Sequence, residues 1–295
     1  MRNFGLPRLA ATILARHFHG LSPRGEVPAE PPRGPTRIHP SASVDETATL
    51  GAACQVGPGC VVRSGARLGA GVVLAERVSV GEGSEVGERS ALGPGVVLYG
   101  RVKIGRRFTI HANAVIGRPG FGYAWDGKRH LHMPQVGGVV IGDEVEIGAG
   151  SYVDGGTFRP TLLGDGCIVD NQVQIGHNCR IGSGVVLCGQ VGIAGGAELG
   201  DGVIVGGQAG INGHVKIGSG AIIGGTAAVG GDIAAGALVQ GTPAVALRLL
   251  ETLTAERRDI ALETTLATLS HAHRIERWRA AGYRVELVYL RLAGV

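Results

Sequence analysis

The stretch from Val56 to Val80, VGPGCVVRSGARLGAGVVLAERVSV, carries an aliphatic residue at every sixth position. The same register runs from Ile38 to Ile116, resumes from Ile141 to Val153 and, after a shift of four residues, continues from Leu163 to Val229. An amphipathic helix repeats its apolar residues every three to four positions, and a half-buried strand repeats them every two. A period of six therefore predicts short strands that each turn one aliphatic side chain inward, with a turn after each strand.

The composition agrees with such a repeat. The chain has 295 residues, of which 53 are glycines, and aromatic residues make up only 4% of it. Glycine suits a chain that bends every few residues, and a narrow core is filled by Val, Ile and Leu rather than by rings. Three hexads form one triangular coil, and successive coils stack at roughly the 4.8 Å strand spacing. The predicted fold is an all-β repeat, a parallel β-helix of hexapeptide repeats.

The period divides the chain into three parts. Residues 1–37 hold a short amphipathic helix candidate, Leu9 to Phe18, and a Pro-rich linker. Residues 38–243 form the β-helix, interrupted by a long excursion at 117–138, and long loops inserted in a rigid repeat are usually functional. Residues 244–295 place leucines at helical spacings up to residue 280, which predicts a C-terminal helical extension that caps the β-helix or packs against symmetry mates.

Charge and composition bear on the class of protein. The net charge is +4, and the basic residues form no stripe interleaved with aromatics, which argues against nucleic-acid binding. No apolar run reaches membrane-spanning length, and the N-terminus lacks a clean signal peptide. The five cysteines are odd in number and form no CxxC pair, which favours small core residues or surface thiols in a reducing compartment. The predicted location is cytoplasmic.

One histidine stands out in a wall of small residues. His177 is the second residue after the inward Ile175, so it should point outward near a corner. Gly195 follows it by one coil in the same register and should lie directly above it. A base beside a closely approaching amide N–H suits acyl transfer, because the base takes a proton while the amide stabilises the oxyanion. Gly213 continues this row, and His214 follows it. The alternative interpretation of His177 is a solvated surface side chain.

Several strings resemble the UDP-3-O-acylglucosamine N-acyltransferases, enzymes of lipid A biosynthesis. The resemblance runs from about Ile38 to Pro243 and implies a left-handed coil, although crossovers between parallel strands are usually right-handed. The strings that carry it are Gly120-Phe121-Gly122-Tyr123, Pro134-Gln135-Val136-Gly137, Val139-Val140-Ile141-Gly142-Asp143, Asp170-Asn171-Gln172-Val173-Gln174-Ile175-Gly176-His177-Asn178 and Ile211-Asn212-Gly213-His214.

The resemblance also implies residue roles. It makes His177 the general base, Gly195 the oxyanion donor and His214 an assisting residue. Asp170 matches the aspartate that precedes the base by seven residues, and we expect it to position or polarise His177. Substrate contacts are expected at Phe121, Tyr123, Gln135, Asn171 and Gln174.

The implied reaction is transfer of a 3-hydroxyacyl group from acyl carrier protein to the 2-amino group of UDP-3-O-acylglucosamine. The donor brings its own phosphopantetheine arm, so neither a metal nor an organic cofactor is expected. The family works as a homotrimer with its sites in clefts between neighbouring prisms, and the excursion should line such a cleft.

The chain departs from that family in two places. The family carries an N-terminal domain that grips the uridine, whereas residues 1–37 look like only the last helix and linker of that domain. Either the start codon is placed too late, or the chain is a shortened relative whose acceptor is not a UDP-sugar. The second departure is Val153-Asp154-Gly155-Gly156, where the family usually has Ile-Asp-Arg-Gly, and it bears on acceptor or carrier-protein contacts.

Three other interpretations stay open. One is a hexapeptide-repeat acyltransferase or acetyltransferase that acts on another amino sugar, with coenzyme A or acyl carrier protein as donor. Another is a non-catalytic structural relative. The third is a γ-type carbonic anhydrase, which needs three zinc-binding histidines across a subunit interface. The histidines of the repeat lack the close final pair of that family: His111, His130, His132, His177 and His214.

Overall fold

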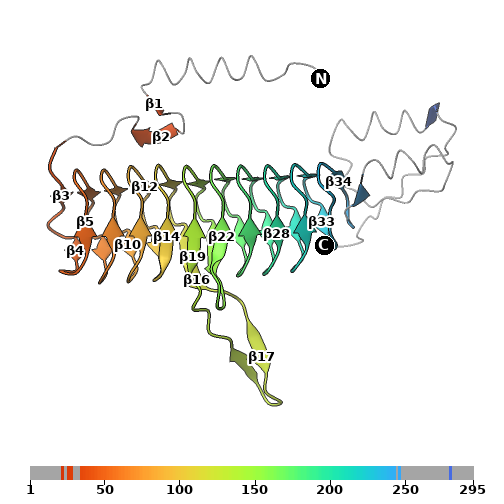
Figure 1. The fold of residues 1–295 in the computed structure, drawn as a ribbon, viewed down its shortest axis with the longest axis horizontal. Coiled ribbons are helices and arrows are strands. Elements are labelled where there is room, and N and C mark those ends of the chain that lie inside the picture. The colour runs from red at the N-terminus through yellow and green to blue at the C-terminus, as the bar shows by residue number, and fades with distance from the viewer. Residues whose placement is uncertain (1–20, 23–24, 29–33, 244, 247–278, 281–295) are drawn as a thin grey trace, which may run out of the picture.

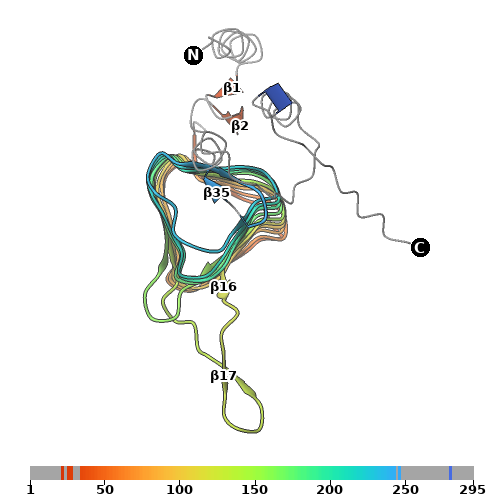
Figure 2. The same cartoon turned by 90° about the vertical axis from the view of Figure 1, so that its right-hand side faces the viewer.

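The computed structural model describes residues 21–22, 25–28, 34–243, 245–246 and 279–280. From Arg37 to Gln240 the chain winds as a left-handed parallel β-helix, which is a triangular prism when seen along its axis (Figures 1 and 2). Its three faces are a 10-stranded, a 9-stranded and a 12-stranded sheet. The predicted hexapeptide β-helix is therefore confirmed.

Each coil visits the three faces in turn, so neighbours in one sheet come from successive coils. The 10-stranded sheet holds β4 (Ser43–Val44), β7 (Val61–Val62), β10 (Ser79–Val80), β13 (Val97–Leu98), β16 (Val115–Pro119), β21 (Tyr152–Gly155), β24 (Gln174–Ile175), β27 (Gly192–Ile193), β30 (Gly210–Ile211) and β33 (Ala228–Val229). The 9-stranded sheet holds β5 (Thr49–Leu50), β8 (Arg67–Leu68), β11 (Glu85–Val86), β14 (Val102–Ile104), β19 (Val139–Ile141), β22 (Thr161–Leu163), β25 (Arg180–Ile181), β28 (Glu198–Leu199) and β31 (Lys216–Ile217).

The third face also carries the end of the described β-helix. The 12-stranded sheet holds β3 (Arg37–Ile38), β6 (Gln55–Val56), β9 (Val73–Leu74), β12 (Ala91–Leu92), β15 (Thr109–Ile110), β20 (Glu146–Ile147), β23 (Ile168–Val169), β26 (Val186–Leu187), β29 (Ile204–Val205), β32 (Ile222–Ile223), β34 (Leu238–Gln240) and β35 (Val245–Ala246). Its last strand is antiparallel to β34. Two separate antiparallel pairs are β1 (Leu21–Ser22) with β2 (Gly25–Pro28) and β17 (Tyr123–Trp125) with β18 (His130–His132).

Most hexads bury two side chains rather than the single one that the period predicts. Leu187 is fully buried, and so is Val185 two positions before it. Side chains alternate along an extended segment, so residues two apart both face the interior. Small residues often fill the second position, which is also held by four free cysteines: Cys54, Cys60, Cys167 and Cys179. Burial raises the pKa of the Cys179 thiol to about 11, which makes it a core residue and a poor nucleophile.

Most corners have the left-handed backbone region at the third position after the inward aliphatic residue. Glycine takes this region at several corners, such as Gly184 (φ +64°), while Asn178 (φ +60°) and His214 (φ +61°) take it at others. Asparagine and histidine tolerate it better than most side chains. A non-glycine side chain at this position therefore projects from a corner whose backbone is fixed by the turn.

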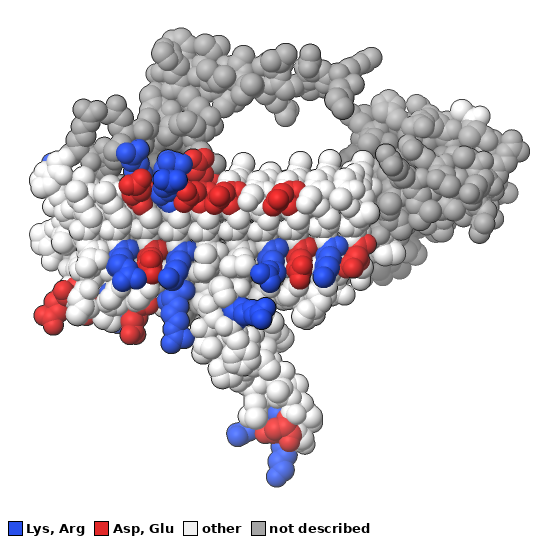
Figure 3. Space-filling model, viewed as in Figure 1, with Lys and Arg blue, Asp and Glu red and all other residues white. Residues whose placement is uncertain are grey.

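The three faces carry different outward side chains. The 9-stranded face bears charges of alternating sign, as Figure 3 shows, and Glu85 pairs with both Arg67 and Lys103 at 2.8 and 3.0 Å. The 12-stranded face presents exposed aliphatic side chains, namely Ile168, Ile204, Ile222 and Leu238. At the same coil heights the 10-stranded face is nearly bare, because its outward positions are Gly192, Gly210 and Ala228.

The excursion leaves from one corner of the prism (Figures 1 and 2). It begins within β16, where a bulge at Gly117 (φ +86°) shifts the register so that Arg118 lies beside Asp154 on β21. The chain then forms the β17–β18 hairpin and returns to the prism at β19. Ile104 and Ile141 pair directly across the insertion, so it leaves the stacking of the coils unchanged.

The segments predicted for the two chain ends lie mostly outside the described residues. The helix expected for Leu9 to Phe18 lies outside the described residues, as does the extension at 244–295 apart from β35 and the helical pair at 279–280. In the described part of the chain, no helix is long and apolar enough to cross a membrane.

The alternation along β19 gives a matched test of the core. Ile141 points inward and is 2% exposed, whereas its neighbour Val140 points outward and is 37% exposed. We expect Ile141→Ala to lower the free energy of unfolding by about 2–5 kcal/mol, because it leaves a cavity in a rigid stack. Val140→Ala should cost less than about 1 kcal/mol. Urea denaturation of both variants measures this, and similar losses would contradict the assigned register.

Candidate functional site

His177 follows β24 at the corner between the 10-stranded and 9-stranded sheets. Its ring lies between two glycines. A Cβ on Gly195, one coil above, would stand 2.7 Å from the His177 Nε2 atom, and a Cβ on Gly120 would stand 2.6 Å from the His177 Cβ atom. Neither glycine has a positive φ, so close approach to the histidine is what requires glycine at both places. The predicted vertical pair of His177 and Gly195 is present.

Asn178 determines which ring nitrogen of His177 carries the proton. Its Oδ1 atom accepts hydrogen bonds from the backbone N–H of Thr157 at 3.1 Å and from the Thr157 hydroxyl at 2.8 Å. Its Nδ2 atom donates to the carbonyl oxygen of Arg159 at 3.2 Å, which fixes the orientation of the amide. The His177 Nδ1 atom lies 2.9 Å from the same Oδ1 and must therefore be the donor. In the neutral ring this leaves Nε2 with a free lone pair.

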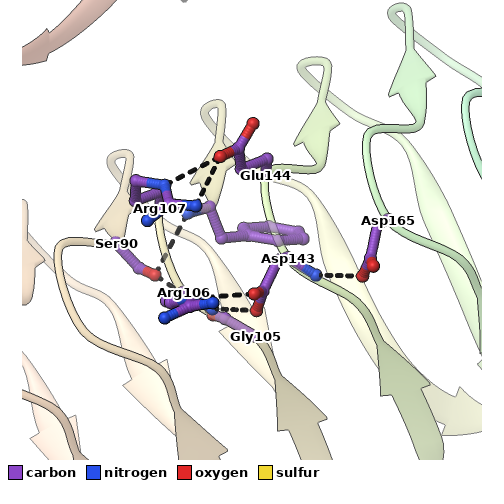
Figure 4. A network of polar contacts seen from close by, with 8 residues as sticks. Ser90, Gly105, Arg106, Arg107, Asp143, Glu144 and Asp165 are labelled. Carbon is purple, nitrogen blue, oxygen red and sulfur yellow. Dashed lines mark hydrogen bonds and ion pairs between the residues drawn. The ribbon is translucent and has the colours of Figure 1, made fainter.

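The amide N–H of Gly195 has no acceptor within the described part of the chain. Some other corners cap the equivalent N–H with a side chain from the next coil. Asp201 caps Ser183 in this way at 2.8 Å, and Asn171 caps Ala149 at 2.7 Å. Figure 4 shows two more caps, from Asp143 to the N–H of Arg106 and from Asp165 to that of Asp143.

Two residues keep the Gly195 N–H uncapped. The residue that would supply the cap is Gly213, which has no side chain. At each capped corner a glycine precedes the capped residue, and at Gly182 a Cβ would stand 2.5 Å from the capping oxygen of Asp201. The corresponding residue here is Ala194, whose Cβ occupies that space. The Gly195 N–H is therefore available to a ligand beside His177 Nε2.

His214 lies on the same corner, one step further along. Its backbone N–H donates to the carbonyl oxygen of Gly195 at 3.2 Å. Its ring packs on the next residue, since a Cβ on Gly196 would stand 2.5 Å from the His214 Nδ1 atom. The structure thus brings His177, Gly195 and His214 together, with the two rings on successive glycines.

Asp170 and Asn171 lie elsewhere on the prism. They follow β23 at the corner between the 12-stranded and 10-stranded sheets, whereas His177 follows the next strand at the next corner. Asp170 accepts the N–H of Asn171 at 2.7 Å and faces a hollow that Asn171, His111 and Glu146 also line. Within one chain the structure does not bring either residue to His177.

A carboxylate that the sequence analysis did not assign to the site lies one coil below it. Asp154 is 4% exposed, and its Oδ2 atom accepts a hydrogen bond from Gln174 Nε2 at 3.1 Å. Its Oδ1 atom accepts no hydrogen bond and lies 3.6 Å from Arg118 Nη1. Burial raises the pKa of the Asp154 carboxyl above its usual value, and the charge of Arg118 opposes this. The sequence signal that could have pointed to it is the string Val153-Asp154-Gly155-Gly156, in which an aspartate directly follows an inward valine.

The remaining predicted contacts lie beside this corner. Phe121 and Tyr123 are exposed and meet edge to face, with ring centroids 5.1 Å apart. Gln135 lies against Gly122, and its Oε1 atom is buried without a hydrogen-bond partner. Gln174 borders a shallow hollow over the bare stripe of Gly192 and Gly210.

Among the residues that the structure describes, no three His, Cys, Asp or Glu side chains gather closely enough to hold an ion. The polar atoms that converge at His177 are an imidazole nitrogen and an amide N–H, which suit proton transfer and oxyanion binding.

Comparison with known proteins finds a family model that matches part of this chain and a set of named relatives. Residues 160–195 match the bacterial transferase hexapeptide family of six repeats. A Cupriavidus metallidurans protein named UDP-3-O-acylglucosamine N-acyltransferase is 50% identical over 150 residues, which cover 50% of this chain and 41% of the relative. A Polynucleobacter asymbioticus protein of the same name is 38% identical over 145 residues, covering 48% and 41%. The resemblance is confirmed for about half of this chain, which spans about two fifths of these relatives.

Solved structures agree on the fold. UDP-N-acetylglucosamine acyltransferase from Campylobacter jejuni is 25% identical, with a TM-score of 0.54 over 82% of each chain. UDP-N-acetylglucosamine O-acyltransferase from Moraxella catarrhalis is 26% identical, with a TM-score of 0.55 over 81% of this chain and 83% of that one.

The role of Asn178 can be tested without any activity assay. Asn178→Ala removes the acceptor of the His177 Nδ1–H, so we expect the proton to redistribute between the two ring nitrogens. The ¹⁵N chemical shifts of the His177 ring report this directly. Asn113→Ala is the matched control, because Asn113 has the same left-handed backbone (φ +59°) at another corner. Unchanged His177 shifts in Asn178→Ala would show that Asn178 does not set the tautomer.

Proposed function

We propose that this protein is an acyltransferase that moves a 3-hydroxyacyl group from acyl carrier protein to the 2-amino group of UDP-3-O-acylglucosamine, a step of lipid A biosynthesis. One observation carries the proposal. An imidazole whose Nε2 atom is free lies against Gly195, whose N–H has no acceptor in the described residues. The names of the relatives support the substrate class.

The first half of the reaction uses His177. The amine nitrogen attacks the thioester carbonyl carbon, and His177 Nε2 takes the proton that the amine loses. The Nδ1–H of the ring stays bonded to Asn178, so the imidazolium that forms keeps its orientation. A positioned base of this kind typically contributes a rate factor of about 10²–10⁴.

The second half uses Gly195. The carbonyl oxygen becomes an oxyanion, which accepts a hydrogen bond from the Gly195 N–H. The C–S bond then breaks, the proton on His177 passes to the departing thiolate, and the amide and the free pantetheine thiol are released. A preformed N–H gives catalysis because it needs no reorganisation when the charge develops.

The other residues have supporting roles in this proposal. His214 assists at the upper end of the site, and Gln174 contacts substrate at the edge of the bare stripe. Phe121, Tyr123 and Gln135 contact it from the excursion. The exposed aliphatic row on the 12-stranded face supports a homotrimer, in which a neighbouring prism would close the site and could bring in Asp170 and Asn171. The reaction needs no resident metal or organic cofactor, and we place it in the cytoplasm.

Transfer to a different amino sugar is the second candidate. The observation that favours it is Gly155, which lies in the coil below His177 where the family usually has arginine. A Cβ at Gly155 would stand 3.2 Å from the carbonyl oxygen of Gly117, and glycine itself supplies no cation at that position. An acceptor with less negative charge than a sugar nucleotide would fit this change.

The base is tested by His177→Ala. We expect the rate of acyl transfer to fall by about 10³-fold, because the amine then loses its proton acceptor. The assay is mass spectrometry of the product formed from UDP-3-O-acylglucosamine and 3-hydroxyacyl carrier protein, with acyl coenzyme A as a competing donor. Wild-type rates in His177→Ala would refute the mechanism. Product formed only from another amino sugar would favour the second candidate.

The role of the Gly195 N–H as oxyanion donor is tested by giving it a side-chain acceptor within the protein. The double variant Ala194→Gly/Gly213→Asp recreates the arrangement of Asp201 over Ser183, so we expect an aspartate oxygen to occupy the Gly195 N–H. The rate should then fall by about 10²-fold or more while the thermal stability is kept. Ala194→Gly alone is the control and should leave the N–H open. Full activity in a capped, folded double variant would remove Gly195 from the mechanism.

A further inference from the structure

The coil below His177 contains a charged group that the mechanism above does not use. Asp154, on β21, is the one charged residue among the buried side chains in the described part of the chain. A buried carboxylate without a compensating partner is strongly unfavourable, so the groups around it should explain why it is there.

Asp154 contacts the two segments that lead to the His177 ring. Its Oδ2 atom accepts the Gln174 Nε2–H, and Gln174 lies on β24, the strand that ends just before His177. Its Oδ1 atom faces the guanidinium of Arg118 on β16, the strand that leads into the excursion. The bulge at Gly117 is what turns Arg118 toward Asp154.

These contacts connect Asp154 to His177 along two separate paths. Two residues after Arg118 the chain reaches Gly120, which packs against the Cβ end of the His177 side chain, whereas Gly195 packs against its Nε2 end. Three residues after Gln174 it reaches His177 itself. The path from Asp154 through Arg118 to Gly120 and the path through Gln174 to His177 therefore meet at the imidazole.

We infer that Asp154 is a positioning residue, which with Arg118 holds the root of the excursion so that Gly120 keeps the His177 ring against Gly195. The inference rests on the proposed function only in treating His177 as the reacting base. Asp154 itself touches no reacting atom in this arrangement.

The charges around Asp154 show why the arginine matters. The groups that face it are Arg118 from β16, Gln174 from β24, and His177 and Cys179 from the turn that follows. Of these, Arg118 carries a permanent positive charge. Without it the carboxylate would keep one hydrogen bond and lose the cation that ties it to the excursion.

The test combines two measurements on four single variants. Asp154→Asn keeps an acceptor for Gln174 and removes the charge, while Arg118→Gln removes the cation. Arg118→Lys restores a charge at the same place. Glu198→Gln is the control, because Glu198 is an exposed carboxylate on the 9-stranded face, one coil above the site. The first readout is the rate at which diethyl pyrocarbonate modifies His177, followed by peptide mass spectrometry. The second is kcat and KM.

We expect Asp154→Asn and Arg118→Gln to speed modification of His177 about threefold or more, since the ring loses its support on the Gly120 side. Their kcat should fall about tenfold with KM changed less than twofold, because small displacements of a catalytic group mainly slow the chemical step. Arg118→Lys should recover most of both losses. The control should match the wild type.

Wild-type modification rates in both Asp154→Asn and Arg118→Gln would overturn the inference. Arg118 is exposed, so its variant carries the test even if Asp154→Asn does not fold. The modification readout needs no substrate. If the rates change as expected but the wild type transfers no acyl group, the positioning role stands and the proposed function fails.

Discussion

The structure depends on backbone hydrogen bonds between successive coils. The N–H of Gly176 donates to the carbonyl oxygen of Ile193 at 2.8 Å, and the same step of one coil recurs along all three faces. Because each such bond joins a residue to the neighbour of its equivalent in the next coil, the height of every residue is set by its place in the hexad. The distance between His177 and Gly195 is therefore a property of the backbone ladder rather than of their side chains.

Side chains cap the corner N–H in some coils and leave it open in others, so the residue types at a corner decide whether its N–H can bind a ligand. At the corners of Ser183 and Ala149 a carboxylate or amide side chain from the next coil closes the open N–H. Gly213 offers no side chain, and Ala194 fills the space where a cap would sit. The open N–H thus depends on small residues, and the two histidine rings pack on the glycines beside it.

The positions that are set by the six-residue period could be predicted from the sequence. The inward residues and the vertical pair of His177 with Gly195 depend only on counting, and both are present. Asp154 with Arg118 was not predictable, because the period places residues 36 apart in the sequence two coils from each other. The excursion and the bulge at Gly117 instead make them neighbours on adjacent strands. The orienting role of Asn178 depends on the turn at Thr157, where the hexad pattern is interrupted. The second inward residue of each hexad is often Ser, Ala or Cys rather than a large aliphatic residue. A search for aliphatic residues at a fixed period therefore does not find it.

The direct pairing of Ile104 with Ile141 has a consequence for how such a chain can change over time. The coils on either side of the excursion close up as though nothing had been inserted, so the length and content of that loop are nearly independent of the stability of the prism. A corner of this kind tolerates insertions and replacements that a packed globular core would reject. Substrate preference can then diversify through the part of the loop beyond Gly120, while the base and the amide beside it stay where the scaffold and the root of the loop hold them.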